Sequence, residues 1–284
     1  MKTTLTPTPL RNHSCITSIG LALAMGGGLG QYAAAQDVSL NTANNFAILA
    51  GSTITNTGPT VVSGGNIGLS PGTSITGFLP GTITPPYTLH IADAAAVQAQ
   101  NDLTAAFNAA AGLAPTTILT GADLGGMTLT PGVYHFASSA QLTGILTLND
   151  QGNADSVFVF QIGSTLTTAS GSSVITINDP SAPGINVFWQ IGSSATLGTG
   201  TEFEGNIMAD SSITVNTGST MGGRLLAETG AVTLDDDTIS VPQQENTGNG
   251  GGGSAVPETG STLMMLGAGL AALFALNRRC FAPV

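Results

Sequence analysis

The chain has 284 residues, a formal net charge of −11 and few charged side chains, which make up 7% of its residues. Arg224 is the only basic residue between Gln36 and Glu245, and this excludes nucleic acid as a ligand, because phosphates need several Lys or Arg partners. The two cysteines, Cys15 and Cys280, lie near the chain ends, so packing rather than a disulfide must hold the roughly 210 residues between them.

Residues 1–35 have the features of a secretory signal peptide. Lys2 and Arg11 precede an apolar run from Cys15 to Leu29, and Ala33-Ala34-Ala35 provides a cleavage site of small residues. A membrane helix is the alternative, but the apolar run is short and rich in glycine. We therefore expect the mature chain to begin just after this segment and to leave the cell.

Short strands open the region that follows, residues 36–245. Phe46–Ala50 and Ser52–Thr55 have the composition of strands, and Asn56–Pro59 has the composition of a turn. Further short apolar pieces separated by Gly and Pro continue this rhythm. We expect one mainly β domain over residues 36–245.

One long helix interrupts the β pattern. From Asp93 to Ala111 the chain is rich in alanine and contains neither Gly nor Pro, and Leu103 and Phe107 fall on one stripe at helical spacing. Asp93 suits the N-terminal cap, and Gly112 supplies the stop. The pattern predicts a helix over about residues 92–112 that packs along the β structure and covers an apolar flank.

Two later segments are almost continuously apolar. Val157–Phe160 and Val187–Trp189 have the pattern of strands that are covered on both faces. We expect these strands to form the core where the helix meets the β structure.

A threonine pattern recurs along the second half of the chain. Ser164–Thr167, Ser193–Thr196, Ser211–Thr214 and Gly230–Thr233 each pair a small residue with a Thr two positions later. Alternate residues of a strand point to the same side, so each pair lies on one face. The segments recur at steps of roughly 20 residues, apart from one longer step that contains the loop Asp179–Gly184, and this period suits one turn of a β-solenoid.

Stacked coils would place these pairs in two columns of hydroxyl and methyl groups on a flat wall. Coils stack about 4.8 Å apart and alternate residues on a strand lie about 6.6 Å apart, a grid that can hold ordered water. The stiff χ1 angle of Thr keeps such a grid rigid. The predicted face consists of Thr53, Thr55, Thr165, Thr167, Ser194, Thr196, Ser212, Thr214, Ala231 and Thr233.

A competing set of hydroxyl residues lies further along each coil. It consists of Ser170, Thr199 and Thr217, followed by Ser172, Thr201, Ser219 and Thr238. This set could form the flat wall instead, or it could mark the corner where each coil turns.

Acidic residues suggest two other functions, polysaccharide cleavage and metal binding. Glu202 and Glu204 have strand spacing and could act as the acid/base pair of a polysaccharide-cleaving solenoid, but Arg224 is the only cation to help bind substrate, and no Ser or Cys nucleophile signature is present. Asp235–Asp237 could bind Ca²⁺, but the chain lacks a repeated Gly-Asp calcium pattern and a His/Cys cluster for zinc. We expect no enzymatic activity, no metal and no cofactor.

The C-terminal part has the layout of a sorting signal. Residues 246–255 form a Gly-rich linker, and residues 256–284 contain Val-Pro-Glu-Thr-Gly, an apolar stretch and then Arg278-Arg279. A plain membrane tail is the alternative, but the apolar stretch is short for a span. The layout resembles PEP-CTERM signals, the VPDSG variant especially, which bacterial exosortases process; the motif is also similar to the Leu-Pro-x-Thr-Gly motif of sortases, although its first residue differs. Both resemblances imply a secreted or cell-surface protein and a processing enzyme of the exosortase or sortase type.

The β region as a whole, about residues 38–241, resembles the microbial ice-binding (antifreeze) β-solenoid family. The similar segments are Asn45–Ala50, Thr55–Thr60, Gly68–Gly72, Leu129–Tyr134, Val159–Ser164 and Glu204–Ile207. The resemblance implies an irregular, discontinuous, right-handed β-solenoid of triangular section with one long α-helix packed alongside. Some relatives carry a capping subdomain before the helix; here Thr76–His90 is short, so we expect no such cap.

The same resemblance implies a function without chemistry. A monomer of this family adsorbs to the surface of an ice crystal through one flat face, and it thereby inhibits ice growth and recrystallisation. The alternative is a cell-surface adhesin or matrix protein with no ice activity, which the sorting signal would also suit.

Overall fold

A computed structural model describes residues 38–180 and 183–242, which belong to one compact unit that ends at Pro242. The predicted signal peptide (1–35), linker (246–255) and sorting segment (256–284) lie outside the described residues, so these domain boundaries remain predictions. No helix among the described residues is long and apolar enough to cross a membrane.

Parallel strands build three faces of this unit. The helix-covered face contains β1 (Phe46–Ala50), β4 (Asn66–Leu69), β7 (Leu89–Ile91), β8 (Thr117–Ile118), β10 (Gly132–Phe136), β13 (Phe158–Ile162) and β16 (Val187–Ile191). The threonine face is the seven-stranded sheet of β11 (Ala140–Leu142), β14 (Leu166–Thr168), β17 (Ala195–Leu197), β19 (Ile213–Val215), β21 (Val232–Asp235), β2 (Thr53–Thr57) and β5 (Ser74–Thr76), in that spatial order. The third face contains β3 (Val61–Ser63), β6 (Thr82–Ile83), β9 (Thr128–Leu129), β12 (Ile145–Asn149), β15 (Ser173–Ile177) and β22 (Thr238–Ser240).

Two long strands belong to two faces at once. β18 (Glu202–Ala209) pairs with β15 of the third face at its start and with β16 of the helix-covered face at its end, and β20 (Thr220–Ala227) follows β18 along its whole length. Both strands turn the corner at glycines, Gly205 with φ +114° and Gly223 with φ +150°, values that only glycine adopts readily. The three faces therefore form the predicted right-handed β-solenoid of triangular section.

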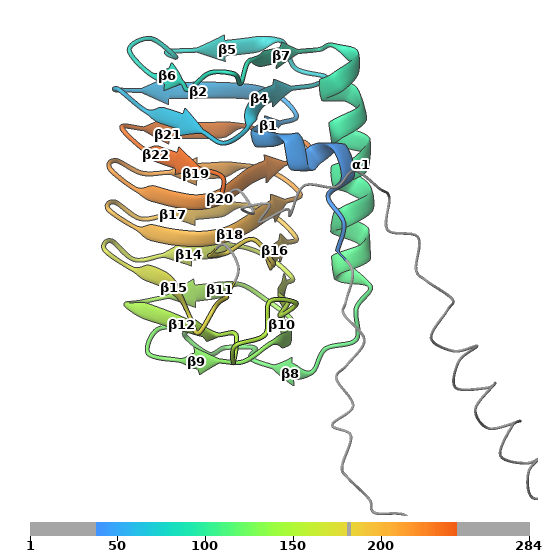
Figure 1. Cartoon of the computed structure of the whole chain (residues 1–284), viewed down its shortest axis with the longest axis vertical. Coiled ribbons are helices and arrows are strands. Elements are labelled where there is room, and N and C mark those ends of the chain that lie inside the picture. Colours follow the sequence, from blue (N-terminus) through green and yellow to red (C-terminus); the bar gives the residue numbers. More distant parts are fainter. Residues whose placement is uncertain (1–37, 181–182, 243–284) are drawn as a thin grey trace, which may run out of the picture. The chain divides into compact units, whose positions relative to one another are not determined.

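The coils are not stacked in chain order, as predicted. The last strands dock onto the first ones, because β20 pairs with β1, β21 pairs with β2, and β22 pairs with β3. Figure 1 shows this junction where orange strands lie beside blue ones. The chain thus begins inside the stack, builds one end through β7, crosses to the other end, and returns coil by coil to its start.

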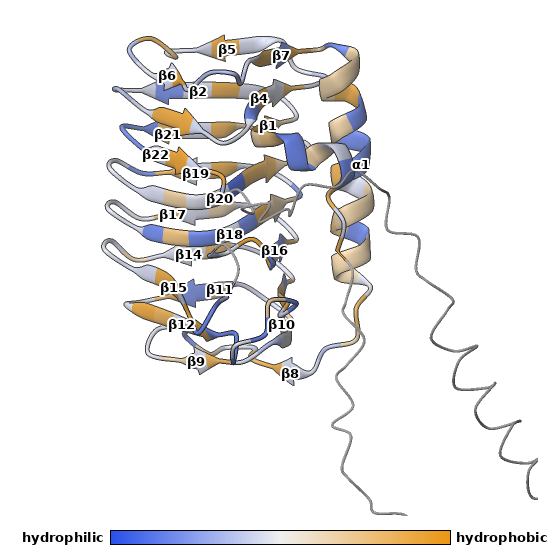
Figure 2. Ribbon diagram, viewed as in Figure 1, coloured by the Kyte–Doolittle hydropathy of each residue, from blue (hydrophilic) through white to orange (hydrophobic). Residues whose placement is uncertain are grey.

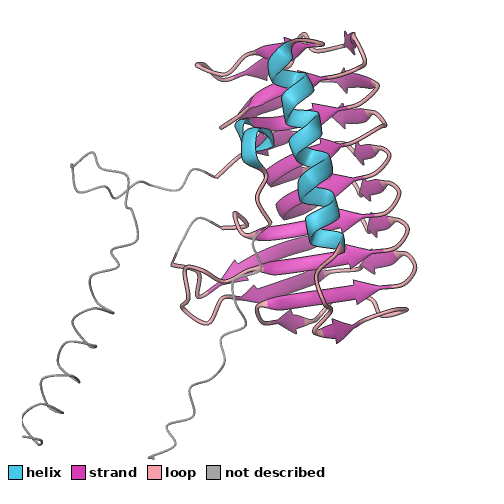
Figure 3. Ribbon diagram, turned by 90° about the vertical axis from the view of Figure 1, so that its right-hand side faces the viewer, coloured by secondary structure: helices cyan, strands magenta, loops and turns pink. Residues whose placement is uncertain are grey.

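The crossing is made by α1 (Ala94–Ala111), which lies along the stack and across the strands of the helix-covered face (Figure 3). Its bounds fall inside the predicted range of 92–112. The Asp93 carboxylate accepts a hydrogen bond from the backbone N–H of Ala96 and caps the first turn. At the other end, the buried Gln161 side chain donates to the carbonyls of Ala110 and Leu113, both at 2.8 Å, and so satisfies groups that a helix end leaves unpaired.

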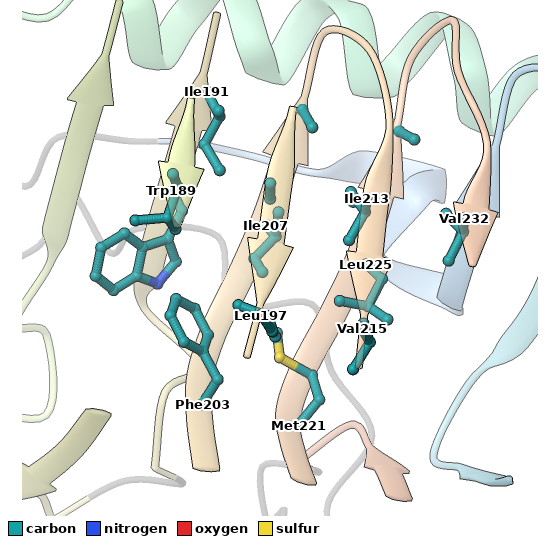
Figure 4. Close-up of a cluster of buried hydrophobic side chains, with 14 of the residues drawn as sticks. Trp189, Ile191, Leu197, Phe203, Ile207, Ile213, Val215, Met221, Leu225 and Val232 are labelled. Carbon is teal, nitrogen blue, oxygen red and sulfur yellow. The ribbon is translucent and has the colours of Figure 1, made fainter. Parts of the chain in front are cut away.

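Apolar positions recur along the stacked strands (Figure 2) and fill two clusters. Inside the solenoid, aromatic rings pack from coil to coil. The ring centroids of Phe160 and Trp189 lie 3.9 Å apart, and those of Trp189 and Phe203 lie 4.9 Å apart. Figure 4 shows Trp189 and Phe203 among the aliphatic side chains of neighbouring coils. The second cluster lies under α1, where Val159 and Phe188 meet the buried side of the helix. This confirms the prediction that these two strands are covered on both faces.

Arg224 is the one cation among the described residues, and it is buried where the chain closes on itself. Its guanidinium donates to the carbonyl of Asn44, in the short 3-10 helix η1 (Asn41–Asn45), at 3.0 and 3.2 Å, and to the side-chain oxygen of Asn206 at 2.8 Å. Burial lowers the pKa of Arg224 to about 10, so the group stays charged near neutral pH. Arg224 therefore joins the first element of the described chain to two of the last strands.

Candidate binding face

An unbroken column of threonines runs along the threonine face. The strand pairings place Thr167 beside Thr196, Thr196 beside Thr214, and Thr214 beside Thr233. The column continues across the junction of the chain, because Thr233 pairs with Thr55 and Thr55 pairs with Thr76. The predicted members of this column are thus neighbours in space.

The strands that carry the column are rigidly anchored. In β19 and β21, the residues on either side of the central Thr are buried aliphatic side chains of the solenoid core: Ile213 and Val215 beside Thr214, and Val232 and Leu234 beside Thr233. Because alternate residues point to opposite sides, this burial leaves Thr214 and Thr233 directed outward. Core packing therefore holds the orientation of the column.

The hydroxyl groups at the centre of the column are available to water. Within residues 38–180 and 183–242, the side chains of Thr167, Thr196, Thr214 and Thr233 form no hydrogen bond to another group. Each side chain presents a hydroxyl and a methyl group at the surface. Neighbouring coils place these groups about 4.8 Å apart.

The second predicted column plays a partly different role. Thr165 donates to the Ser139 hydroxyl at 2.8 Å, while the Ser194 hydroxyl accepts from the backbone N–H of Ser212 at 3.3 Å. The Ser212 hydroxyl in turn accepts from the backbone N–H of Ala231 at 3.1 Å. These side chains brace one coil against the next, so the column supports the face as well as lining it.

The sequence reasoning missed four residues at the two ends of the face. Ser74 and Thr76 pair with Thr53 and Thr55, and Gln141 pairs with Thr167. Ser139, two residues before Gln141, contacts Thr165 as described above. Ser74-Ile75-Thr76 has the same pattern as the other segments, a small residue and a Thr two positions later, and this pattern is a signal that could have identified it. It lies far in the chain from the segments that recur about every 20 residues.

The competing set of hydroxyl residues does not form a flat wall. Its members Ser172, Thr201 and Ser219 are buried, with at most 1% of their surface exposed. Thr238 does not continue this row, because it pairs with Thr220, and Asp237 lies beside Ser219 on the next coil. The remaining members, Ser170, Thr199 and Thr217, are exposed in turns.

The buried residues brace a corner between the threonine face and the third face. Ser219 donates to the carbonyl of Gly198 at 3.1 Å, and Thr201 contacts the Thr168 hydroxyl at 2.9 Å. The Asp237 carboxylate accepts the backbone N–H of Ser219 at 2.9 Å, and burial raises the pKa of Asp237 to about 6. Of the two alternatives left open for this set, the burial of Ser172, Thr201 and Ser219 supports the corner where each coil turns.

The acids considered for catalysis lie on the third face. Glu202 is exposed, whereas burial raises the pKa of Glu204, whose Oε2 atom has no hydrogen-bond partner among the described residues. Burial and the neighbouring Asp179 raise the pKa of Asp150 to about 7. No group of acidic, His or Cys side chains in the described part of the chain, Asp235–Asp237 included, has an arrangement that could hold a metal ion.

Charged groups are confined to the margins of the threonine face. Asp210 and Glu228 lie in the turns that lead onto it, and burial together with the charge of Asp210 raises the pKa of Glu228 to about 7. Asp235 lies at the far end of β21, two residues beyond Thr233. The central column therefore presents hydroxyl and methyl groups without a charge among them.

Comparisons with known proteins agree with this architecture. Residues 48–240 match the family described as Ice-binding-like, and residues 255–280 match the VPDSG-CTERM motif. An ice-binding protein from Nostoc sp. (strain HG1) is 51% identical over 247 residues, which cover 84% of this chain and 87% of the relative.

Solved structures show the same fold. The crystal structure of an ice-binding protein from the Antarctic ascomycete Antarctomyces psychrotrophicus superimposes with a TM-score of 0.68 at 45% identity, covering 72% of this chain and 98% of that one. An ice-binding protein from an Arctic yeast, whose structure was described as the basis of its antifreeze activity, gives a TM-score of 0.65 at 31% identity, covering 78% of this chain and 98% of that one. The chain belongs to the ice-binding protein family, and it carries a C-terminal VPDSG-CTERM sorting motif.

Proposed function

We propose that this protein adsorbs to ice crystals through the threonine face and so inhibits ice growth and recrystallisation. The observation that carries the proposal is the register of the six threonines Thr167, Thr196, Thr214, Thr233, Thr55 and Thr76 on adjacent strands. All three of the relatives and structures described above are themselves named as ice-binding proteins.

The chemistry of the column supports adsorption to ordered water. Each hydroxyl can anchor one water molecule, and each methyl group excludes water from the space beside it. The spacing of about 4.8 Å between coils repeats along the column, and the buried neighbours of each Thr keep the grid from relaxing. The central column lacks charged groups, which would hold water in their own hydration geometry.

The same features argue against chemistry at this face. No carboxylate among the described residues forms a hydrogen bond with a hydroxyl of the column, so none is placed to act as its general base. We propose that the protein acts as a monomer without catalysis, cofactor or metal. The family match gives no support to the alternative of an adhesin without ice activity.

We further propose that the chain is exported and that an enzyme of the exosortase type, or a sortase, processes its C-terminal segment. The match of residues 255–280 to the VPDSG-CTERM motif supports export to the cell surface or beyond. The predicted signal peptide at residues 1–35 fits this route.

The proposal is tested by thermal hysteresis and ice-crystal shape for purified residues 36–245. We expect a gap between melting and freezing and faceted crystals. Thr214→Tyr should lower the hysteresis several-fold, because a large ring would hold ice away from the neighbouring coils. Thr220→Tyr is the matched control: Thr220 is an exposed strand Thr on the third face, and this change should leave the hysteresis intact. Equal losses for the two variants would place the ice-binding surface elsewhere.

A further inference from the structure

The end of the described chain has a fixed place in the triangular section. β22 belongs to the third face, and Val241 follows it directly, buried against the core. The backbone N–H of Val241 donates to the carbonyl of Ser63 at 3.0 Å, and its backbone closely approaches Gly64. The polypeptide is therefore packed in place up to the last residues of the unit.

This exit point lies on the edge where the third face turns into the helix-covered face. In the neighbouring strand β20, Gly222 pairs with Ser240, so the corner residue Gly223 stands at the level of Val241. In a triangular section, the edge between two faces is opposite the remaining face. The chain consequently leaves the unit on the side opposite the threonine face.

The described chain also begins away from the threonine face. Val38 and Leu40 pack into the cluster under α1, with Leu103 and Phe46. The long loop 150–157 connects the third face to the helix-covered face, and the described residues 178–180 and 183–186 belong to the same connection in the next coil, so they too lie along the edge opposite the threonine face. The turns on both sides of β14, β17, β19 and β21 are short. Within residues 38–180 and 183–242, neither the first nor the last residues nor a long loop stands over the central coils of this face.

We infer that the protein holds ice while it is attached, through its C-terminal segment, to the surface of the cell that exports it. The exit edge lets the threonine face point away from the attachment, and the chain beyond Pro242 leads into the sorting motif at residues 255–280. This inference rests on the proposed function of the threonine face. It adds to that function a second partner, the surface of the exporting cell, which the protein contacts on the side away from the ice crystal.

Coupling the protein to beads in defined orientations tests the geometry. An unprocessed chain that begins at residue 36 has a single thiol, Cys280, through which it can be attached on the C-terminal side of its linker. Two variants carry Cys280→Ser and a new thiol, either Thr214→Cys on the threonine face or Asn101→Cys on the exposed side of α1. Beads coupled through Cys280 or through position 101 should adsorb to a growing ice surface at least ten times more often than beads coupled through position 214.

Thermal hysteresis of each uncoupled protein distinguishes a failure of the attachment inference from a failure of the proposed ice-binding function. If the free proteins show hysteresis but Cys280-coupled beads adsorb no better than beads coupled through position 214, the attachment inference fails and the ice-binding function stands. If the free proteins show no hysteresis, the proposed function itself fails.

The cells that make the protein supply the second test. Cells with the full chain should bind to ice and leave little hysteresis activity in their medium. A chain that stops after residue 245 should reverse both results: activity in the medium and no binding of cells. Full-chain cells that release active protein and do not bind ice would overturn the inference.

Discussion

Thr55 and Thr233 lie side by side on paired strands, although one belongs to the first coil of the described chain and the other to the last. The pairing of β2 with β21 joins two groups of coils into one sheet, so the threonine column passes from Thr214 through Thr233 and Thr55 to Thr76 without a gap. The extent of the proposed ice-binding face therefore depends on how the chain closes on itself.

One prediction concerns the end of the column. Gln141 is exposed and in register with Thr167, but its long flexible side chain interrupts the pattern of hydroxyl and methyl groups. Gln141→Thr should extend the grid by one coil and raise thermal hysteresis at equal protein concentration. Gln141→Lys is the control, because a charged and flexible group at this site should bring no gain. An unchanged hysteresis for Gln141→Thr would mean that the active face ends at the coil of Thr167.

A second prediction concerns the closure itself. Arg224→Ala removes the donors to Asn44 and Asn206 and leaves the buried side-chain oxygen of Asn206 without a partner. Because unsatisfied buried polar groups are costly, the free energy of unfolding in urea should fall by about 3 kcal/mol. Arg224→Lys should recover only part of this loss, since an ammonium group cannot reproduce the forked geometry of the guanidinium.

The exposed helix residue Asn101 provides the control for this measurement. Asn101→Ala should change the free energy of unfolding by less than about 0.5 kcal/mol. An Arg224→Ala protein as stable as the Asn101→Ala protein would show that the closure does not depend on this cation.

A third prediction concerns pH. Burial and the charge of Asp210 raise the pKa of Glu228 from 4.5 to about 7 in the folded protein. Between these values the folded state holds a proton that the unfolded state has lost, so this group makes the protein less stable as pH rises from about 4.5 to about 7. Glu228→Gln should therefore stabilise the protein at pH 8 by about 1 kcal/mol, a figure reduced for partial solvent screening, and have little effect at pH 4.

Thermal unfolding of parent and variant at the two pH values checks this prediction. The difference in Tm between Glu228→Gln and the parent should grow from pH 4 to pH 8. The same difference at both values would mean that Glu228 does not exchange a proton on folding. The Oε1 atom of Glu228, which is buried and lacks a hydrogen-bond partner among the described residues, gives the physical reason why its neutral form is favoured.

Local patterns in the sequence were sufficient to predict much of the fold. The pairs of a small residue and a Thr at period two identified the strands β14, β17, β19 and β21, and the apolar residue between the two members of each pair is buried. The alanine-rich segment without Gly or Pro located α1, because helix propensity and capping act within a few residues. The family resemblance supplied the handedness and the discontinuous order of coils, which no local pattern encodes.

The limits of the face could not be predicted in the same way. Whether Ser219 faces solvent or the interior depends on one step of register at the corner, and hydroxyl residues occur on both sides of that step. Thr76 belongs to the face only because β5 stacks on β2, a contact between separate coils. Such long-range register depends on the packing of the whole solenoid and not on the residues of one segment.

The most direct test of the account is the thermal hysteresis of Thr55→Tyr compared with that of Thr220→Tyr. Thr55 is far in sequence from the main Thr repeats and reaches the column only through its pairing with Thr233. The account predicts that Thr55→Tyr lowers hysteresis several-fold while retaining the Tm of the parent, and that Thr220→Tyr does not lower it. Full hysteresis in a folded Thr55→Tyr protein would contradict the claim that one continuous threonine face binds ice.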